Sequence, residues 1–211
     1  FFWEGMKQTT RYTYVFDDLS DSSSLKQGMA ERCKRMLKKA EKLGVQAVET
    51  DDLRLMFDVN QQTFERQNRS FPYSYELVAR IDDACRTHAG RRILISKDEQ
   101  GEIHSCDYMV YDEQCAISLL QGANPKFRDS GAQRFLDWNS INFAATVSKK
   151  FDFEGSMIPG IEVYNREFGA RPAPYYEITG KKSRVDSKTM SARWRKKLSQ
   201  TLRKLATIVE P

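Results

Sequence analysis

The spacing of apolar residues changes several times along the chain, and each change marks an expected helix or strand. Apolar residues three to four positions apart predict helices, whereas alternation and short β-branched or aromatic runs predict strands. Helices are expected over residues 24–43, 53–67, 74–87, 130–148 and 159–168. Strands are expected over residues 11–16, 45–49, 92–97, 103–111, 115–121, 150–153 and 174–179.

The order of these elements predicts the fold class. Ser24 and Gln27 have capping-box spacing, which marks the beginning of the first helix. Short turns separate the three strands between residues 92 and 121, which is typical of an antiparallel meander. Helices, meander, helix, strand, helix and strand in succession predict an α/β (α+β) domain with a mixed, largely antiparallel sheet flanked by helices.

Three segments with different roles are expected along the chain. Phe1-Phe2-Trp3 begins without a Met, so residues 1–10 are expected to be the remnant of a missing N-terminal half. Residues 11–179 are expected to form the folded domain, and residues 180–211 a tail. No apolar run approaches the roughly 20 residues that a membrane-spanning helix needs.

Charge is distributed unevenly between these segments. Apolar residues make up 40% of the chain, enough for a core, and the formal net charge is +5. Residues 181–211 hold ten Lys and Arg against two acidic residues, a net charge of +8, whereas the first 180 residues hold 24 basic and 27 acidic groups, a net charge of −3. The basicity therefore belongs to the tail, which does not favour nucleic-acid binding by the whole domain.

The tail itself predicts a basic amphipathic helix over residues 187–208, with Trp194 on its apolar stripe. Such a helix docks on its own domain, on a partner protein, on tRNA or on an anionic membrane surface. We therefore expect a cytoplasmic protein, with peripheral contact at the inner face of the membrane as an open alternative.

Cysteines and histidines provide poor material for a metal site, so no metal is expected. The four cysteines form no CxxC pair, and His88 and His104 are the only histidines. Cys106 and Cys115 could face each other in a hairpin, but reduced core thiols are favoured. Either histidine could act as a base, although a lone histidine is more often structural.

A candidate anion site lies where the meander leads into the next helix. Amide groups at a helix N-terminus bind phosphates, and cations and small residues beside it would help. The residues concerned are Gln121, Gly122, Lys126, Arg128, Ser130, Gly131 and Ala132. The alternative is that Ser130 and Gln133 form a capping box and that nothing binds there.

A candidate base lies at the end of the strand near residue 152. Phe151-Asp152-Phe153-Glu154-Gly155-Ser156 carries two carboxylates in alternation with Phe, so Asp152 and Glu154 could share one face. A carboxylate can accept a proton, so either residue could act as a general base. Alternatively, Asp152 binds nearby backbone amides and Glu154 is solvated.

Three sequence segments together resemble the conserved segments of one protein family. The run from Phe151 to Ala170 resembles the family's "fDFgGS…gi..FK..FGa" stretch, and Arg32–Val45 resembles its "R..irKAek.gv" helix, with Tyr12-Thr13-Tyr14 before it. Ser130-Gly131-Ala132, followed by Leu136 and Trp138, is similar to the helix between them. These segments resemble the FemAB-like branch of the GNAT acyltransferase superfamily, and the resemblance spans residues 11–178.

The resemblance implies an N-acyltransferase with a GNAT-like sheet. Its donor would be acyl-CoA, bound at a loop of the form Arg/Gln-x-x-Gly-x-Gly/Ala, which Arg128 and Gly131 match but Gln133 does not. Two alternatives are an aminoacyl-tRNA-dependent aminoacyltransferase of the peptidoglycan-bridge type and a degenerate GNAT-like binding module without catalysis. Family members usually carry two GNAT-like halves, and acceptors include amines of small molecules and of cell-envelope precursors.

The resemblance also implies roles for residues near position 165, where this sequence departs from the family. Tyr164 and Asn165 stand in place of the family's Phe-Lys pair, so Asn165 could donate a hydrogen bond to an oxyanion but supplies no charge. Tyr164 and Asn165 would shape the acceptor pocket, with Tyr108 and Arg166 as further candidate substrate-binding residues. The six basic residues between Arg32 and Lys42 form either a solvated helix face or a phosphate contact.

Overall fold

The computed structural model describes residues 1–88 and 90–180, which form two units. One unit is Arg11–Tyr175, and the other includes Phe1–Thr10 and, among the described residues, Tyr176–Gly180. The predicted tail helix over residues 187–208 lies outside the described residues. All of the candidate site residues belong to the unit Arg11–Tyr175.

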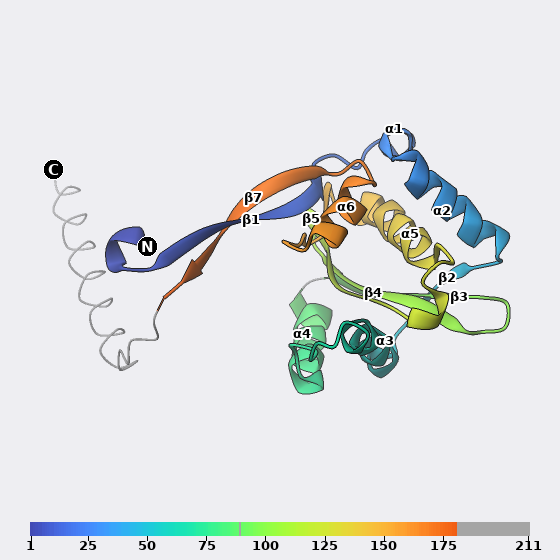
Figure 1. Cartoon of the computed structure of the whole chain (residues 1–211), viewed down its shortest axis with the longest axis horizontal. Helices are drawn as coiled ribbons and strands as arrows, with labels where there is room; N and C mark the ends of the chain where they lie inside the picture. Colours follow the sequence, from blue (N-terminus) through green and yellow to red (C-terminus); the bar gives the residue numbers. More distant parts are fainter. Residues whose placement is uncertain (89, 181–211) are drawn as a thin grey trace, which may run out of the picture. The chain divides into compact units, whose positions relative to one another are not determined.

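A seven-stranded sheet forms the centre of the fold, with strand order β2-β3-β4-β5-β6-β1-β7 (Figure 1). Strand β5 pairs with β6 in parallel, whereas the pairs β2–β3, β3–β4, β4–β5 and β1–β6 are antiparallel. The strands are β1 (Lys7–Phe16), β2 (Gln46–Thr50), β3 (Gly90–Lys97), β4 (Ile103–Tyr111), β5 (Cys115–Ala123), β6 (Lys150–Asp152) and β7 (Arg171–Thr179). The predicted mixed, largely antiparallel sheet and its meander are confirmed.

Helices cover both faces of this sheet. Figure 1 shows α2 and α5 on one face and α3 and α4 on the other. The helices are α1 (Ser22–Gly28), α2 (Glu31–Lys42), α3 (Leu53–Glu65), α4 (Tyr75–His88), α5 (Ala132–Val147) and α6 (Pro159–Arg166), with short 3₁₀ helices η1 (Phe2–Glu4) and η2 (Pro125–Phe127). Most boundaries lie within a few residues of the predicted ones.

The core divides between the two faces because successive residues of a strand point to opposite sides. Met109 of β4 packs in the cluster that contains Ile141 of α5, whereas its neighbour Tyr108 packs in the cluster that contains Val78 of α4. This division decides which polar residues can meet. Side chains on the α5 face can form a site together, and those on the α4 face cannot join them.

The predicted continuous helix over residues 24–43 is wrong, because the chain breaks between α1 and α2. Ala30 has an extended backbone with ψ of 147°, and its N–H donates to the carbonyl oxygen of Glu167 at 2.9 Å. Asp21 caps α1 by accepting from two backbone N–H groups, so the expected capping box of Ser24 does not form. A contact with the end of α6 thus overrides a helical sequence pattern.

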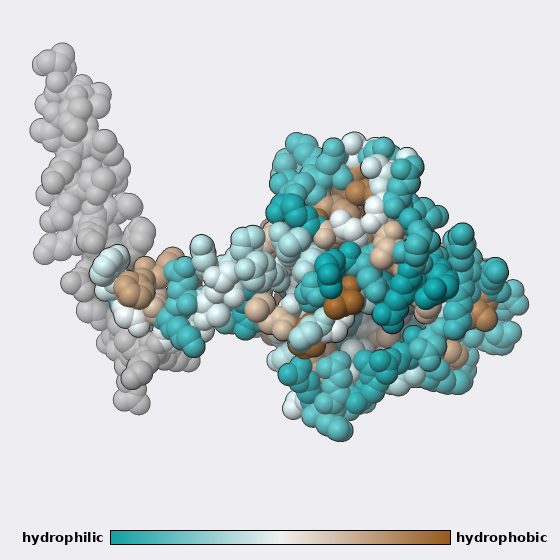
Figure 2. Space-filling view, turned by 45° about the horizontal axis from the view of Figure 1, so that its top comes forward, coloured by the Kyte–Doolittle hydropathy of each residue, from teal (hydrophilic) through white to brown (hydrophobic). Residues whose placement is uncertain are grey.

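The surface, the cysteines and the lengths of the helices describe the fold further. Figure 2 shows a mostly hydrophilic face, with hydrophobic side chains gathered in a few places. All four cysteines are free, with Cys33 and Cys106 buried. Across residues 1–88 and 90–180, no helix combines the length and the apolar character needed to cross a membrane.

Candidate functional site

Strands β5 and β6 are paired at one end and separate at the other. Their parallel pairing covers Cys115–Ile117 and Lys150–Asp152, although β5 continues to Ala123. Beyond this point β5 stays paired with β4, whereas Phe153 stays with β1 by donating to the carbonyl oxygen of Tyr14 at 2.9 Å. We call the region between residues 118–121 and residues 153–155 the fork.

The register of β5 changes within the fork. Tyr108 pairs with Leu120 and Met109 pairs with Ser118, so Leu119 is an extra residue in β5. A bulge of this kind bends a strand and interrupts its hydrogen-bond ladder. The bulge therefore helps to turn the end of β5 away from β6.

One backbone amide on β5 faces the fork. Asn124 donates its N–H to His104 of β4, whereas the N–H of Ala123 donates to the hydroxyl of Thr63 at 2.9 Å, on the side away from β4. Because N–H groups alternate in direction along a strand, the N–H of Gln121 also points away from β4. Gln121, rather than Gly122, therefore supplies a backbone amide that faces the fork.

A buried carboxyl group lies behind Gln121. Asp137 of α5 is fully buried, and its Oδ1 accepts from the side-chain amides of Gln121 at 3.0 Å and Gln133 at 2.8 Å. The hydroxyl of Tyr164 also donates to Asp137. Burial and the neighbouring charge of Asp107 raise the pKa of Asp137 to about 7. Asp137 therefore orients the side chain of Gln121 and ties α6 to α5.

A second buried carboxyl group supports the first from β4. Asp107 accepts from the hydroxyls of Ser118 and Ser140, and burial raises its pKa. Sequence reasoning missed both aspartates. The signal that could have found Asp137 is the polar series Gln133, Asp137 and Ser140, which lies at helical spacing on one face of α5.

An ion pair lies beside Tyr164, next to the buried carboxyl group of Asp137. Arg134 of α5 is buried, forms an ion pair with Glu167 and lies over the ring of Tyr164, with 4.2 Å between the guanidinium carbon and the ring centroid. Arg32 of α2 approaches the same carboxylate at 3.5 Å. Three elements, α2, α5 and the end of α6, are thereby joined.

The two predicted carboxylates near residue 152 have different surroundings. Asp152 is half-buried and accepts from the hydroxyl of Thr13 and, at 2.7 Å, from the N–H of Glu154. Glu154 is exposed overall, in a left-handed conformation with φ of 61°. Partial removal of its carboxyl group from water and the charge of Asp152 raise the pKa of Glu154 to about 7. Asp152 therefore holds the loop, while Glu154 has the accessibility of a base.

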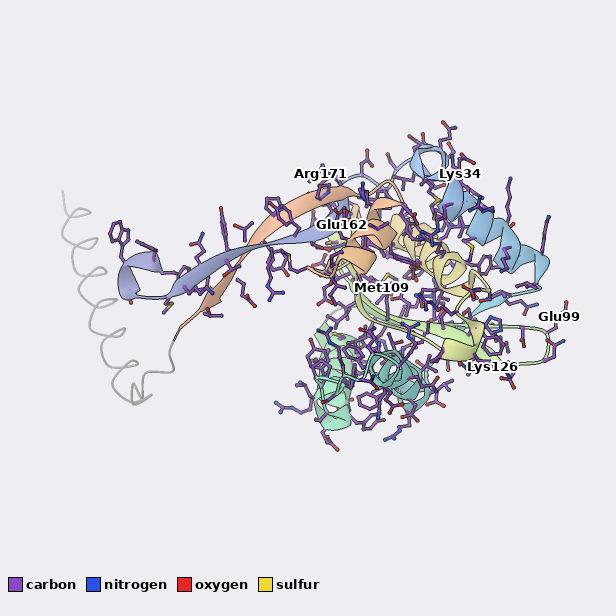
Figure 3. The ribbon with its side chains drawn as sticks, viewed as in Figure 1. Lys34, Glu99, Met109, Lys126, Glu162 and Arg171 are labelled. Carbon is purple, nitrogen blue, oxygen red and sulfur yellow. The ribbon has the colours of Figure 1, made fainter. Side chains whose placement is uncertain are left out.

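A groove of about 380 Å³ adjoins this loop. Its lining comes from β1, from the segment between β6 and the middle of α6, and from β7: Tyr12, Tyr14, Ser156, Met157, Pro159, Glu162 and Pro172. The hydroxyl of Tyr14 donates to Oε1 of Glu162 at 2.6 Å, a bond that, with burial, raises the pKa of Tyr14. Figure 3 shows Glu162 projecting from α6.

The predicted anion site at the start of α5 is not open in the structure. Ser130, Gly131 and Ala132 are buried, and a methyl group on Gly131 would lie only 2.2 Å from the carbonyl oxygen of Met36. The hydroxyl of Ser130 accepts from the N–H of Ala132 and lies 3.2 Å from Nδ1 of His104. Gly131 thus permits close packing of α2 on α5, and the tip does not fit a pyrophosphate.

The remaining predicted residues are scattered. Lys126 and Arg128 are exposed, and Nζ of Lys126 lies 3.4 Å from Glu102. Gly122 is buried against the backbone of Asn60, so its small size serves packing on α3. Tyr108 does not reach the fork, because it is fully buried on the opposite face and donates to Asp82 at 3.0 Å.

Residues 164–166 of α6 point in different directions. Tyr164 turns toward Asp137, and Arg166 is exposed and pairs with Glu162 at 3.1 Å. Asn165 is only 2% exposed, and its side-chain Nδ2 has no hydrogen-bond partner among the described residues. Only Tyr164 of these three therefore joins the polar group behind the fork.

Comparisons with known proteins concern the fold that carries this site. FemX shares the fold with a TM-score of 0.69 and 12% identity, over 78% of this chain and 61% of that one. A conserved protein of unknown function from Bacteroides thetaiotaomicron VPI-5482 has a TM-score of 0.60 and 11% identity, over 83% and 62%. L-PGS from Bacillus licheniformis has a TM-score of 0.55 and 13% identity, over 92% and 68%. No curated protein matches the sequence.

These structural likenesses concern the fold, and at that level they confirm the predicted resemblance to the FemAB-like branch. The chain spans about three fifths of the length of FemX and of the Bacteroides protein. Residues 27–164 match the family described as acetyltransferase (GNAT) domain. Because that match covers well over half of the chain and includes β5, α5 and β6 around the fork, the chain belongs to the acetyltransferase (GNAT) domain family.

Proposed function

We propose that the fork is the reaction site of an N-acyltransferase that moves an acyl group, from acyl-CoA as the first candidate donor, to an amine. The observation that supports this most is the separation of β5 from β6. It places an amide N–H, that of Gln121, on one strand and an accessible carboxylate, that of Glu154, just beyond the other.

The chemistry needs one donor and one base. The amine nitrogen attacks the acyl carbonyl carbon, and the negative charge that forms on the carbonyl oxygen is met by the N–H of Gln121; one such donor contributes about 10²–10³ in kcat. The thiolate of CoA then leaves as the amide forms, and the amine proton goes to Glu154. A pKa of about 7 suits this role, because a base works best when its pKa lies near the operating pH.

Supporting roles follow for the neighbouring residues. Asp152 positions the loop that carries Glu154, through its bonds to Thr13 and to the N–H of Glu154. The unpartnered amide of Asn165 is a candidate donor to a ligand oxygen that enters the site. Tyr164 acts indirectly, by holding Asp137 and thereby the side chain of Gln121.

The donor has a second candidate, because one observation disfavours CoA. The buried start of α5 provides no open amide cradle for a pyrophosphate. By contrast, α2 exposes a row of cations that suits a long polyanion such as tRNA: Arg32, Arg35, Lys38, Lys39 and Lys42. The second candidate is therefore an aminoacyl-tRNA-dependent aminoacyltransferase, with a cell-envelope precursor as its amine acceptor.

The test offers both donors to the full chain. Free thiol released from acetyl-CoA, or free tRNA released from an aminoacyl-tRNA, is measured with a panel of primary amines. Glu154→Gln should lower turnover at least 100-fold, while Glu113→Gln, an exposed residue of the β4–β5 turn, should leave it unchanged. Binding of a donor without turnover in the unaltered chain would instead favour a binding module without catalysis.

A further inference from the structure

The groove beside the Glu154 loop has one wall that carries charge and another that is aromatic. Glu162 is one third exposed, and both of its polar contacts, with Tyr14 and Arg166, use the same oxygen, Oε1. Oε2 takes part in neither of these two contacts. A carboxylate can accept about four hydrogen bonds, so this oxygen remains able to bind a donor from a ligand.

The second wall is formed by Tyr12 and Tyr14, which are two residues apart on β1 and therefore lie on one face of the strand. Aromatic faces attract cations through the negative face of the ring. Met157, Pro159 and Pro172 complete the lining with apolar surface, and Met157 is 52% exposed. A carboxylate oxygen, aromatic rings and apolar neighbours together suit an ammonium group attached to an apolar body.

From this geometry we infer that the groove is the acceptor site of the enzyme, and that it selects a primary amine carried on an apolar or aromatic body through Oε2 of Glu162. Calling the groove the acceptor site rests on the proposed function, whereas the binding of a primary amine to the groove does not. Its location differs from the one predicted from sequence, because neither Tyr164 nor Asn165 lines this groove and Tyr164 turns toward Asp137.

The groove and the proposed base are held close together. Ser156 lines the groove and is two residues from Glu154, so their Cα atoms are at most about 7 Å apart. Gly155 lies between them with φ of 58°, and a methyl group there would lie 2.3 Å from the Cα of Thr13. The connecting loop is thus packed directly on the strand that supplies both tyrosines.

Phenethylamine is the probe, with 2-phenylethanol as its neutral analogue and phenylacetate as its anionic one. Binding is followed by NMR of the full chain labelled at methionine methyl groups. Met157 lines the groove, whereas Met29 and Met56 are buried elsewhere and serve as internal controls. We expect phenethylamine to shift the Met157 signal and the two analogues to bind at least tenfold more weakly.

Substitutions then test the charged wall. Glu162→Gln should weaken phenethylamine binding at least tenfold, Arg166→Gln should strengthen it by freeing the carboxylate, and Glu113→Gln should not change it. Tyr12→Ala, at an exposed position, should weaken binding severalfold and covers the case in which Glu162→Gln does not fold. Equal binding of 2-phenylethanol, or an unmoved Met157 signal, would overturn the inference.

Glu154→Gln separates the two proposals. It should abolish transfer while leaving phenethylamine binding intact. Glu162-dependent binding without transfer by the unaltered chain would support the groove and contradict the proposed function. Transfer with an amine KM that Glu162→Gln and Tyr12→Ala leave unchanged would support the function and contradict the groove.

Discussion

The stability of the domain should depend on pH because the buried carboxyl group of Asp137 can gain or lose a proton. Its pKa in the folded chain is about 7, above the ordinary value of 3.8, because burial and the charge of Asp107 disfavour the ionised form. A carboxyl group whose pKa is higher in the folded chain than in the unfolded chain stabilises the fold. This stabilisation is complete below the pKa in the unfolded chain and is lost as the pH rises through the pKa in the folded chain. The fold should therefore lose stability between about pH 4 and pH 7.

Asp137→Asn removes this titration. The loss of unfolding free energy between pH 5 and pH 8, measured with urea, should shrink by on the order of 1–3 kcal/mol relative to the unaltered chain. Some slope should remain, because burial raises the pKa of Asp107 in the same direction. Glu113→Gln is the exposed control. An unchanged slope in Asp137→Asn would show that Asp137 is not the group that titrates.

Glu154 should control the pH dependence of activity in the same range. A general base must be ionised, so kcat/KM should rise with pH through about 7 and this rise should vanish in Glu154→Gln. Because the charge of Asp152 helps to raise the pKa of Glu154, Asp152→Asn should move the rise to lower pH. A rise that keeps its position in Asp152→Asn would contradict the electrostatic link between them.

Residue patterns identified some of these groups and missed others for a physical reason. Glu154 could be proposed as a base because the alternation of carboxylates with Phe in residues 151–154 is visible in sequence. Asp137 and Asp107 could not, because their role depends on burial among partners from β4, β5, α5 and α6. Tyr108 was misplaced because sequence does not tell which face of β4 meets α5.

At the scale of elements, the close approach of α2 to the start of α5 depends on Gly131. Its φ of 82° and the 2.2 Å distance that would separate an added methyl group from the oxygen of Met36 both exclude a side chain. Gly131→Ala should destabilise the domain by roughly 1–3 kcal/mol, seen as a lower Tm. Gly160→Ala is the matched control, because nothing lies within 4 Å of its added methyl group.

Gly131→Ala also tests the alternative role of this tip. If the start of α5 opened to bind a pyrophosphate, the substitution would weaken CoA binding more than it lowers stability. We expect the opposite, a lower Tm with CoA affinity unchanged at temperatures where the chain is folded. The sequence pattern could not separate these roles, because a small residue at a helix start is required both by a phosphate and by a neighbouring helix.

Element types were largely predictable, whereas element ends depended on tertiary contacts. The meander and the helices around it follow from apolar periodicity alone. The break at Ala30 does not, because it depends on a hydrogen bond to Glu167 that is 137 positions away in the chain. The fork likewise does not follow from this periodicity, since strand separation is a property of pairing and leaves no local signal.

At the scale of the whole molecule, the uneven charge should decide how the chain meets polyanions. Removing residues 181–211 changes the net charge from +5 to −3, but it leaves the cations of α2 in place. If tRNA is the donor carrier, its affinity should fall steeply between 50 and 200 mM salt, with a slope set by the number of phosphates contacted. Arg35→Gln with Lys38→Gln should reduce that slope by about two if α2 makes two of these contacts, and removal of 181–211 should reduce it further if the tail contributes.

A slope that is lost with 181–211 and unaffected by the α2 changes would place tRNA contact on the tail alone and would remove the argument that α2 favours an aminoacyl-tRNA donor. The same charge-neutralised α2 should leave phenethylamine binding at Glu162 unchanged, because the two surfaces are formed by different elements and a screened charge acts over only about 10 Å at 0.1 M salt.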